Sequence, residues 1–510
     1  MRACLSRSNQ TRPRCFTIGL PELEFARAEG SYPAGLSHFE VGIIMSARFI
    51  QEPAKFTDVY EEADVVVVGG GTAGVAAALA AAKNGAQTVC IEQYGVLGGT
   101  IIWGAPVINR LQNDYKLHPE AGRKQLVRGI AFEIVKRMVH EGGCPGDMEI
   151  INGEEMTPDP ALMLPEPLKR VLFSMMQEYG VTLLMRTCFA APIMEESGII
   201  GVAVENKAGR GIVLGRKFID CTGDGDLAAR AGCDFIGEIE QDEIKQTTLC
   251  WGMSNVNVPR LFDFWRQHTI AAEFETERGD AQRLLKDIMG FSINLLQIPE
   301  IAPHLSETGV RMLHMISRGT SEVWHINCTR VQPKKGILHY RTALENELKL
   351  REQINFLVTL MKQYIPGFEN AFVSQTQFEV GVRRTRTIRC LYDITLDDIV
   401  EERGFPDEIG RYGYMDLPNP KYHCKNGGSY GIPFRAILPT SVDNLLVAGR
   451  MITSNIKAHM STRNGGCCMI QGEAAGTAAA LCTRLGISLR DLDVKLLQDT
   501  LLSNGVYLQK

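Results

Sequence analysis

The chain lacks the cysteine spacings that metal and cluster sites require. Its 14 cysteines are scattered through 510 residues, and no two of them form a C-x-x-C pair. Zinc ribbons and ferredoxin-type clusters depend on such pairs, and disulfide scaffolds are typical of much shorter secreted chains. The sequence therefore predicts no metal site, and cysteines that mostly serve as small buried apolar residues. A cytoplasmic location follows from the same usage.

A strong charge imbalance is missing too. Lys and Arg number 54 against 59 Asp and Glu, a net charge of -5, which gives no general attraction to nucleic acid. One uncharged apolar run, 65–82, reaches the length of a membrane span, but three glycines interrupt it. A strand, a turn and an alanine-rich helix explain this run better, so we expect no transmembrane segment.

Residues 1–58 lack any sustained periodicity. Their arginines are typical of a transit peptide, whereas Glu22, Glu24 and Glu29 are not. We expect a poorly ordered extension, with Met45 as an alternative start. The sequence leaves open whether residues 1–44 belong to the mature protein.

A β-α-β unit follows. The run 64–68 predicts a buried strand, 72–84 a helix, and 87–91 a second buried strand that ends at Glu92. Gly69, Gly71 and Gly74 fit the pattern G-x-G-x-x-G between the first strand and the helix.

Each part of this motif has a physical role in binding a dinucleotide. Gly69 permits a tight turn, Gly71 lets the backbone approach a diphosphate, and Gly74 lets helix and strand pack closely. Glu92 is placed to accept hydrogen bonds from a ribose 2′-OH, which favours FAD or NAD over NADP. The alternative is a glycine-rich turn in a domain that binds no nucleotide.

The spread of the candidate loops favours FAD over NAD. Further strand-end or glycine-rich segments lie at 95–100, 222–226 and 444–450, so the cofactor elements extend from residue 64 to residue 476. An NAD domain would complete its sheet within about 150 residues. This spread suits an elongated FAD bound to a domain that an insertion interrupts.

Six ordered stretches also resemble a known family. They are DVVVVGGGTAGVAAALAAAKNGAQTVCIEQYGVLGGT (64–100), 218–232, 380–399, 430–439, 444–454 and 459–481. Together they resemble the FAD-dependent oxidoreductase family related to the flavoprotein module of heterodisulfide reductase, and more broadly the glutathione-reductase-like flavoproteins. The cysteine runs that hold the clusters of the heterodisulfide reductase flavoprotein are not present here.

The resemblance implies an α/β fold with a discontinuous, glutathione-reductase-like FAD-binding Rossmann domain and an inserted α+β substrate domain. The expected segments are an extension (1–58), the first part of the FAD domain (59–236), the substrate domain (237–427), the second part of the FAD domain (428–493) and a C-terminal tail (494–510). Within the insertion we expect helices at 281–289 and 344–364.

The resemblance also implies the residues that bind FAD. They are Gly69, Gly71, Thr72, Ala73 and Gly74 at the diphosphate; Glu92 and Gln93 at the ribose; Gly98, Gly99 and Thr100 on the flavin side; Gly223 and Asp224; Gly449 and Arg450; and Gly466, Cys467 and Cys468. Many relatives carry Gly-Asp where this chain has Gly449-Arg450, so Arg450 departs from the pattern.

A closing helix is expected over 469–484, capped by Thr462 or Asn464. Its N-terminus would stabilise negative charge at flavin N1 and the C2 carbonyl. Alternatively, the small residues Gly472, Ala474, Ala475 and Gly476 pack this helix against the first strand.

Four residues are candidates for catalysis. His459 is suited to proton transfer because histidine titrates near neutral pH, and Arg463 is suited to a substrate carboxylate or to reduced flavin. Tyr430 and Arg435 lie in a stretch that reaches the active site in relatives. The alternatives are a structural histidine and interdomain ion pairs.

Two further groups are expected to be inert. The arginines Arg383, Arg384, Arg386 and Arg389 predict a solvated or ion-paired face. Adjacent cysteines form only a strained ring, so Cys467 and Cys468 are not expected to act as a redox pair.

The sequence therefore predicts an FAD-dependent oxidoreductase that transfers a hydride between a small organic substrate and flavin N5. The electron acceptor stays open among oxygen, a quinone and a redox protein. The alternative is a flavin-carrying electron-transfer component of a larger complex related to heterodisulfide reductase. The substrate, covalent attachment of the flavin, an iron–sulfur partner and a homo-oligomeric state are left undecided.

Overall fold

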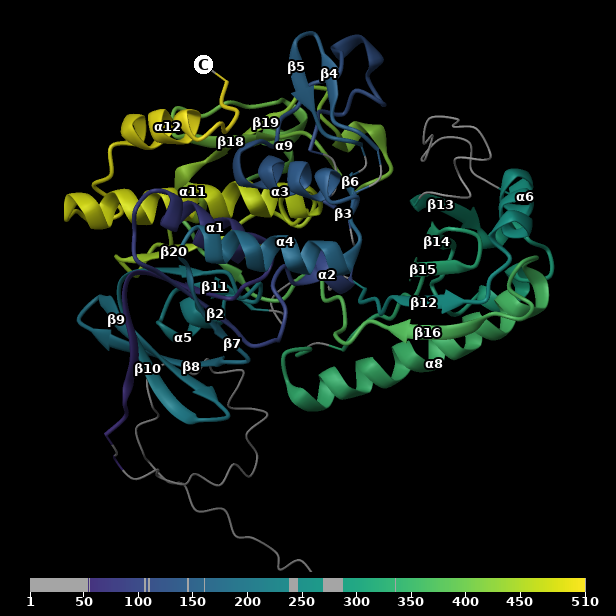
Figure 1. Cartoon of the computed structure of the whole chain (residues 1–510), viewed down its shortest axis with the longest axis horizontal. Coiled ribbons are helices and arrows are strands. Elements are labelled where there is room, and N and C mark those ends of the chain that lie inside the picture. Colours follow the sequence, from purple (N-terminus) through teal and green to yellow (C-terminus); the bar gives the residue numbers. More distant parts are fainter. Residues whose placement is uncertain are drawn as a thin grey trace, which may run out of the picture. The chain divides into compact units, whose positions relative to one another are not determined.

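The computed structural model describes residues 54, 56–104, 107–108, 111–144, 146–159, 161–237, 246–268, 288–334 and 336–509. Almost all of the expected extension over 1–58 lies outside these ranges. Residues 55–510 form one compact unit, in which two main sheets are built from different parts of the chain (Figure 1).

The first sheet has seven strands in the order β7-β2-β1-β10-β9-β8, and β20 also pairs with β10. The strands are β1 (Val59–Val68), β2 (Thr88–Glu92), β7 (Thr182–Met185), β8 (Cys188–Glu195), β9 (Gly198–Asn206), β10 (Gly209–Asp220) and β20 (Leu445–Val447). β7, β2, β1, β10 and β20 run parallel, whereas β8, β9 and β10 form an antiparallel meander. β20 comes from far along the chain, which confirms the discontinuous α/β fold.

The register of this sheet aligns the carboxyl ends of four parallel strands. Val68 pairs with both Ile91 and Asp220, and Asp220 pairs with Val447. The loops that follow β1, β2, β10 and β20 therefore leave the sheet at the same edge. Ligands of open parallel sheets bind at this carboxyl edge.

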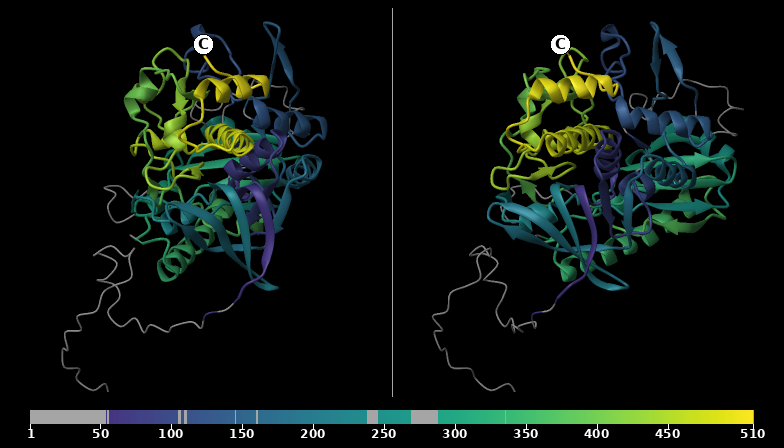
Figure 2. Two further views of the ribbon diagram at one scale, coloured as in Figure 1. Left: turned by 90° about the vertical axis from the view of Figure 1, so that its left-hand side faces the viewer. Right: turned by 60° about the vertical axis from the view of Figure 1, so that its left-hand side comes forward.

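Two small-residue helices pack together beside the sheet. α1 (Thr72–Lys83) and α11 (Gly465–Leu485) lie next to each other (Figure 2). A Cβ atom on Gly472 would lie 2.1 Å from the Ala73 carbonyl oxygen, and one on Gly476 would lie 2.1 Å from that of Ala77. These two glycines thus approach α1 most closely, and α11 also contacts the first strand, as the sequence suggested.

The second sheet is antiparallel in the order β13-β14-β15-β12-β16. Its elements are β12 (Trp251–Ser254), α6 (Val258–His268), β13 (Ile288–Asn294), β14 (Met312–Arg318), β15 (Glu322–Asn327), α8 (Tyr340–Tyr364) and β16 (Phe372–Thr376). The long helix α8, predicted at 344–364, runs along the β16 side of this sheet (Figure 1). Of the helix expected at 281–289, only the last two residues are described, and they begin β13.

The two sheets have separate apolar cores. The core of the second sheet is drawn from residues 249–371, whereas Ile388, Ile399 and Tyr412 belong to the core of the first. β11 (Phe235–Ile236) and β17 (Thr387–Ile388) pair with each other, where the chain leaves the first part and where it returns. The expected domain limits at 237 and 427 stay predictions.

The remaining elements surround the first sheet. The helices are α2 (Thr100–Trp103), α3 (Gly129–His140), α4 (Pro165–Glu178), α5 (Asp226–Arg230), α9 (Leu396–Val400), α10 (His459–Thr462) and α12 (Val494–Ser503). The strands are β3 (Val107–Ile108), β4 (Glu149–Ile151), β5 (Glu154–Met156), β6 (Ala161–Leu162), β18 (Glu408–Tyr412) and β19 (Tyr430–Pro433). In the described ranges, no helix is both long and apolar enough to span a bilayer.

Candidate functional site

The loop after β1 combines a tight turn with open space. Gly69 has φ +100°, and its N–H donates to the Ile91 carbonyl at 2.8 Å. A Cβ atom on Gly74 would lie 1.7 Å from the Gly69 carbonyl oxygen. In contrast, a Cβ atom on Gly71 would meet nothing within 4 Å. Gly71 is the N-cap residue of α1, and no side chain caps this helix end. Free N–H donors with space beside them are what a diphosphate needs.

Glu92 fixes this loop from the end of β2. It is 5% exposed, and its two carboxylate oxygens accept from the N–H groups of Gly70 (2.7 Å) and Tyr94 (2.8 Å). Burial raises the pKa of Glu92, and these two hydrogen bonds oppose the shift. Gln93 beside it is exposed. Contact of either residue with a ribose stays a prediction.

The segment 98–100 packs directly on the first loop. The Gly98 N–H donates to the Gly70 carbonyl at 2.8 Å, and the Thr72 hydroxyl donates to the Gly98 carbonyl at 3.1 Å. A Cβ atom on Gly99 would lie 3.1 Å from the Gly71 Cα. Thr100, which is exposed, begins α2. The structure therefore brings these two predicted cofactor segments together.

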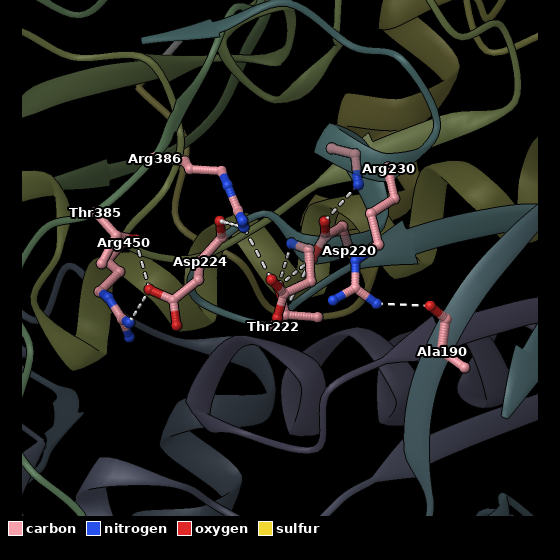
Figure 3. A network of polar contacts seen from close by, with 10 residues as sticks. Ala190, Asp220, Thr222, Asp224, Arg230, Thr385, Arg386 and Arg450 are labelled. Carbon is pink, nitrogen blue, oxygen red and sulfur yellow. Dashed lines mark hydrogen bonds and ion pairs between the residues drawn. The ribbon is translucent and has the colours of Figure 1, made fainter. Parts of the chain in front are cut away.

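The end of β10 is fixed by a buried carboxyl group (Figure 3). Asp220 is fully buried; one oxygen accepts from the N–H (3.0 Å) and hydroxyl (2.8 Å) of Thr222, and the other accepts from the Ala228 N–H at 2.8 Å. Burial raises the pKa of Asp220 to about 6, although these hydrogen bonds oppose it. Asp220 thus positions the following Gly223-Asp224 segment.

Asp224 joins three parts of the chain (Figure 3). Its Oδ1 accepts from the Thr385 hydroxyl at 2.5 Å and forms an ion pair with Arg450. Arg386 donates to the Asp224 carbonyl at 3.1 Å and pairs with Asp226 at 2.9 Å. At the carboxyl edge of the sheet, therefore, Asp224 after β10 and Arg450 after β20 form an ion pair that joins the two loops.

Gly223 and Gly449 both adopt left-handed backbone conformations beside this ion pair. Gly223 has φ +81°, and a Cβ atom there would lie 2.6 Å from Arg450 Nη1. Gly449 has φ +128°, and its N–H donates to Gln471 of α11 at 2.8 Å. The loops after β10 and β20 are thus packed against each other and against the closing helix.

The N-terminus of α11 lies beside that of α1. α11 begins at Gly465, where an added Cβ atom would lie 3.8 Å from the Thr72 methyl group. Asn464 occupies the N-cap position, but its Nδ2 donates back to the carbonyls of Met460 (2.8 Å) and Ser461 (3.0 Å). No side chain caps the helix, so the predicted cap by Asn464 or Thr462 is wrong. The first-turn amides at 465–467 lack a side-chain acceptor.

His459 and Tyr430 are enclosed next to this helix. His459 is fully buried, its Nε2–H donates to the Arg450 carbonyl at 3.1 Å, and its Nδ1 has no hydrogen-bond partner. Burial and the nearby guanidinium groups hold its pKa well below the usual value. The Tyr430 hydroxyl contacts Ser461 Oγ at 2.8 Å, and burial raises its pKa far above the usual range. These contacts favour roles for both residues in positioning the neighbouring segments. Proton transfer by His459 stays a prediction.

The two candidate arginines lie in different surroundings. Arg463 forms an ion pair with Asp416, and its Nε has no partner. Arg435 pairs with Asp407 at 3.2 Å and stacks over the Tyr392 ring at 5.0 Å. It lines a shallow groove with Leu489 and Val494, near the C-terminal helix. The contacts of Arg435 do not include any of the other predicted site residues.

Cys467 and Cys468 lie in the first turn of α11. Both thiols are buried. Burial raises the pKa of Cys467 to about 12 and that of Cys468 further. Thiols of this kind are poor nucleophiles and poor redox centres.

Tyr94 and Glu379, two polar residues near the site, were not singled out from the sequence. Tyr94 stacks edge-on against Phe378 at 5.0 Å and hydrogen-bonds to Glu379.

The arginines of the basic run lie in different surroundings. Arg386 pairs with Asp226, and Arg389 is exposed, 3.9 Å from Asp393. Arg384 is buried. A periodic run of arginines offered no signal that its members would have such different surroundings.

Comparison with known proteins shows the family. The family model described as FAD dependent oxidoreductase matches residues 64–501, so the chain belongs to this family of flavoenzymes, whose cofactor is FAD. Leghemoglobin reductase of Glycine max is 39% identical over 77 residues, and mitochondrial dihydrolipoyl dehydrogenase of Caenorhabditis elegans is 38% identical over 73 residues. The former match covers 15% of each chain; the latter covers 14% of this chain and 15% of the relative.

Solved structures show a distant overall similarity. A geranylgeranyl bacteriochlorophyll reductase-like protein from Thermoplasma acidophilum has a TM-score of 0.42 at 12% identity, covering 87% of this chain and 83% of that chain. A p-nitrophenol 4-monooxygenase from Pseudomonas putida has a TM-score of 0.41 at 12% identity, with coverage of 87% and 89%. Similarity of this extent does not define the chemistry of the chain.

Proposed function

We propose that the carboxyl edge of the first sheet binds one FAD, and that the enzyme transfers a hydride between a small organic substrate and the flavin. The observation that carries this proposal is the open space at Gly71 beside the uncapped N-termini of α1 and α11. When bound, FAD supplies a hydride acceptor at its N5 atom.

We assign residues to successive parts of the FAD molecule, from its diphosphate and ribose to its flavin. Gly69, Gly71, Thr72, Ala73 and Gly74 hold the diphosphate, while Glu92 and Gln93 lie at the adenosine ribose. The other contacts are Gly98, Gly99, Thr100, Gly223, Asp224, Gly449, Arg450, Gly466, Cys467 and Cys468. The first turn of α11 and Arg463 stabilise negative charge at the pyrimidine edge of the flavin.

An anaerobic reduction screen tests this function. Purified protein, reconstituted with FAD, is mixed with carboxylates, alcohols, amines and enoates while its absorbance is recorded. We expect flavin absorbance in the protein fraction and saturable bleaching by one class of compound. Oxygen, a quinone or a redox protein added afterwards identifies the acceptor. A protein that takes up no FAD contradicts the proposal.

The relation to the heterodisulfide reductase flavoprotein stays a prediction, and with it the alternative of an electron-transfer component. The same screen separates the two functions. Bleaching by a small molecule in the isolated chain supports the enzyme, whereas turnover only with an iron–sulfur partner supports the electron-transfer component.

A further inference from the structure

Two arginines of the second sheet region flank one short segment. Arg330 lies just after β15, and Arg383 lies just before β17. Between them, the segment 246–248 bridges both sides, since Thr247 pairs with Val331 and Thr248 pairs with Gly381. The Arg383 Nη1 donates to the Gln246 carbonyl. The backbone therefore sets both guanidinium groups beside the same segment.

Arg463 follows the end of α10 and also acts electrostatically on Arg383. Burial and the repulsion from Arg463 and Arg330 lower the pKa of Arg383 to about 9, while Asp416 acts in the opposite direction. Arg383 stays protonated at neutral pH.

Hydrogen bonds also join the segments of Arg383 and Arg463. The Ser454 carbonyl accepts from Arg384, the neighbour of Arg383, at 3.1 Å. The Ser454 hydroxyl lies 3.1 Å from that of Thr462, the neighbour of Arg463.

Among the described residues, the carboxylates near these arginines are too few to balance their charge. Arg463 pairs with Asp416, but neither Arg330 nor Arg383 forms an ion pair within the residues that the structure describes. The Arg330 side chain donates to two neutral acceptors, the Asn327 amide oxygen at 3.1 Å and the Thr329 carbonyl at 2.8 Å. In the described part of the chain, three guanidinium groups therefore share one carboxylate, an excess of two positive charges.

Arg384 provides an independent observation. It is 7% exposed, and only its Nη2 is hydrogen-bonded, to the Ser454 carbonyl at 3.1 Å. Its Nε and Nη1 are buried without partners, which is costly for a charged group. Arg384 and Arg463 both lower the pKa of His459, so these two guanidinium groups lie near the same imidazole.

The arginines lie next to a segment assigned to the flavin. Cys250 of the second sheet region is close enough to Arg383 and Arg330 for both to act on its thiol. Its Sγ donates to the Gly104 carbonyl at 3.1 Å. Gly104 ends α2, the short helix that begins at Thr100. The cluster is thus connected to the loop that packs on Gly71.

We propose that Arg330, Arg383 and Arg463, together with Arg384, bind a small organic dianion beside the flavin. Its charge is carried by two carboxylates or by one phosphate group, because guanidinium forks pair with both kinds of oxyanion. This inference rests on the proposed oxidoreductase function and names the substrate class of that site.

Titration calorimetry on the FAD-loaded protein tests this site. The probes are succinate, inorganic phosphate and uncharged succinamide, and the variants are Arg330→Gln and Arg383→Gln. We expect succinate or phosphate to bind, succinamide not to bind, and each substitution to weaken binding by about tenfold or more. The matched control is Arg389→Gln, an exposed arginine of the same run, which should leave binding unchanged.

The proposal is overturned if neither anion binds, or if binding survives both substitutions. FAD content, read from absorbance, is measured first, so that a failure of the proposed function is seen separately from a failure of anion binding. If the variants do not fold, phenylglyoxal labelling of the unmodified protein replaces them. The bound anion should then protect Arg330 and Arg383 but not Arg389, and equal labelling of all three contradicts the site.

Discussion

The glycines of the first loop serve different purposes. At Gly74 a side chain would collide with the backbone of Gly69, whereas at Gly71 the backbone angles are ordinary (φ −71°) and the surrounding space is open. Gly74 is thus needed for folding, whereas glycine at position 71 would be needed only by the proposed diphosphate. The sequence motif alone does not separate these two needs.

This difference gives a paired prediction. Gly71→Ala should fold with nearly unchanged stability but bind FAD at least tenfold more weakly, because its methyl group occupies the space of the diphosphate. Gly74→Ala should lose several kcal/mol of stability, roughly the upper range for overpacked sites. Urea denaturation of the apoprotein and FAD titration measure the two effects. Equal losses of stability in both variants would refute the distinction.

The adjacent cysteines should be chemically silent. With buried thiols of raised pKa, Cys467 and Cys468 should escape alkylation by iodoacetamide in the native protein, while exposed Cys188 reacts. Peptide mass spectrometry before and after unfolding measures this. Rapid native labelling of Cys467 would restore the redox-pair hypothesis.

At the scale of elements, the contact between α1 and α11 depends on missing side chains. Gly472 and Gly476 let the backbone of α11 lie directly on α1, which sets the two uncapped helix ends side by side. The position of the α11 N-terminus is therefore decided by packing two and three turns further along this helix.

Gly476→Ala should separate these helices. The added methyl group would lie 2.1 Å from the Ala77 carbonyl oxygen, so we expect a loss of about 1–3 kcal/mol or more of stability and weaker FAD binding. Arg484→Ala, at an exposed position on the last turn of α11, should change stability by less than about 0.5 kcal/mol. Thermal unfolding compares the two variants, and equal melting temperatures would contradict the packing argument.

Local patterns predicted the first β-α-β unit and the long helix α8, since each depends on residues close together in sequence. The sequence could not predict that Asp224 would pair with Arg450, 226 positions away, or that Arg384 would be buried while Arg389 is exposed. This pairing and this burial depend on which loops the strand register places next to one another. The cap expected at Asn464 failed because its side chain finds nearer carbonyls in α10.

For the whole molecule, the buried Glu473 predicts a dependence of stability on pH. Glu473 is 4% exposed, one oxygen accepts from the Ile130 N–H at 2.9 Å, and the other has no partner. Burial raises its pKa to about 8. At a pH between the pKa of this carboxyl in the unfolded chain and its pKa in the native protein, Glu473 is protonated in the native state and ionised in the unfolded state. The contribution of Glu473 to the free energy of unfolding therefore declines as pH rises through this range.

Glu473→Gln should flatten this dependence. We expect the free energy of unfolding of the unaltered protein to fall between pH 5 and pH 8, by at most about 1.4 kcal/mol per pH unit from this group, and the variant to fall less. The exposed Glu352→Gln variant is the control and should follow the unaltered protein. Urea denaturation at several pH values measures the slopes, and parallel slopes for Glu473→Gln would exclude Glu473 as the source.

The pairing of Phe235 with Ile388 and of Ile236 with Thr387 closes the chain at the point where the second sheet branches off. A short linker at this junction would span the gap without disturbing the parallel strands, so the first sheet is separable in principle from the second. Among chains of this architecture, we would therefore look for divergence in substrate chemistry between residues 237 and 386 and at the few positions outside that range, such as Arg463, that belong to the proposed substrate site.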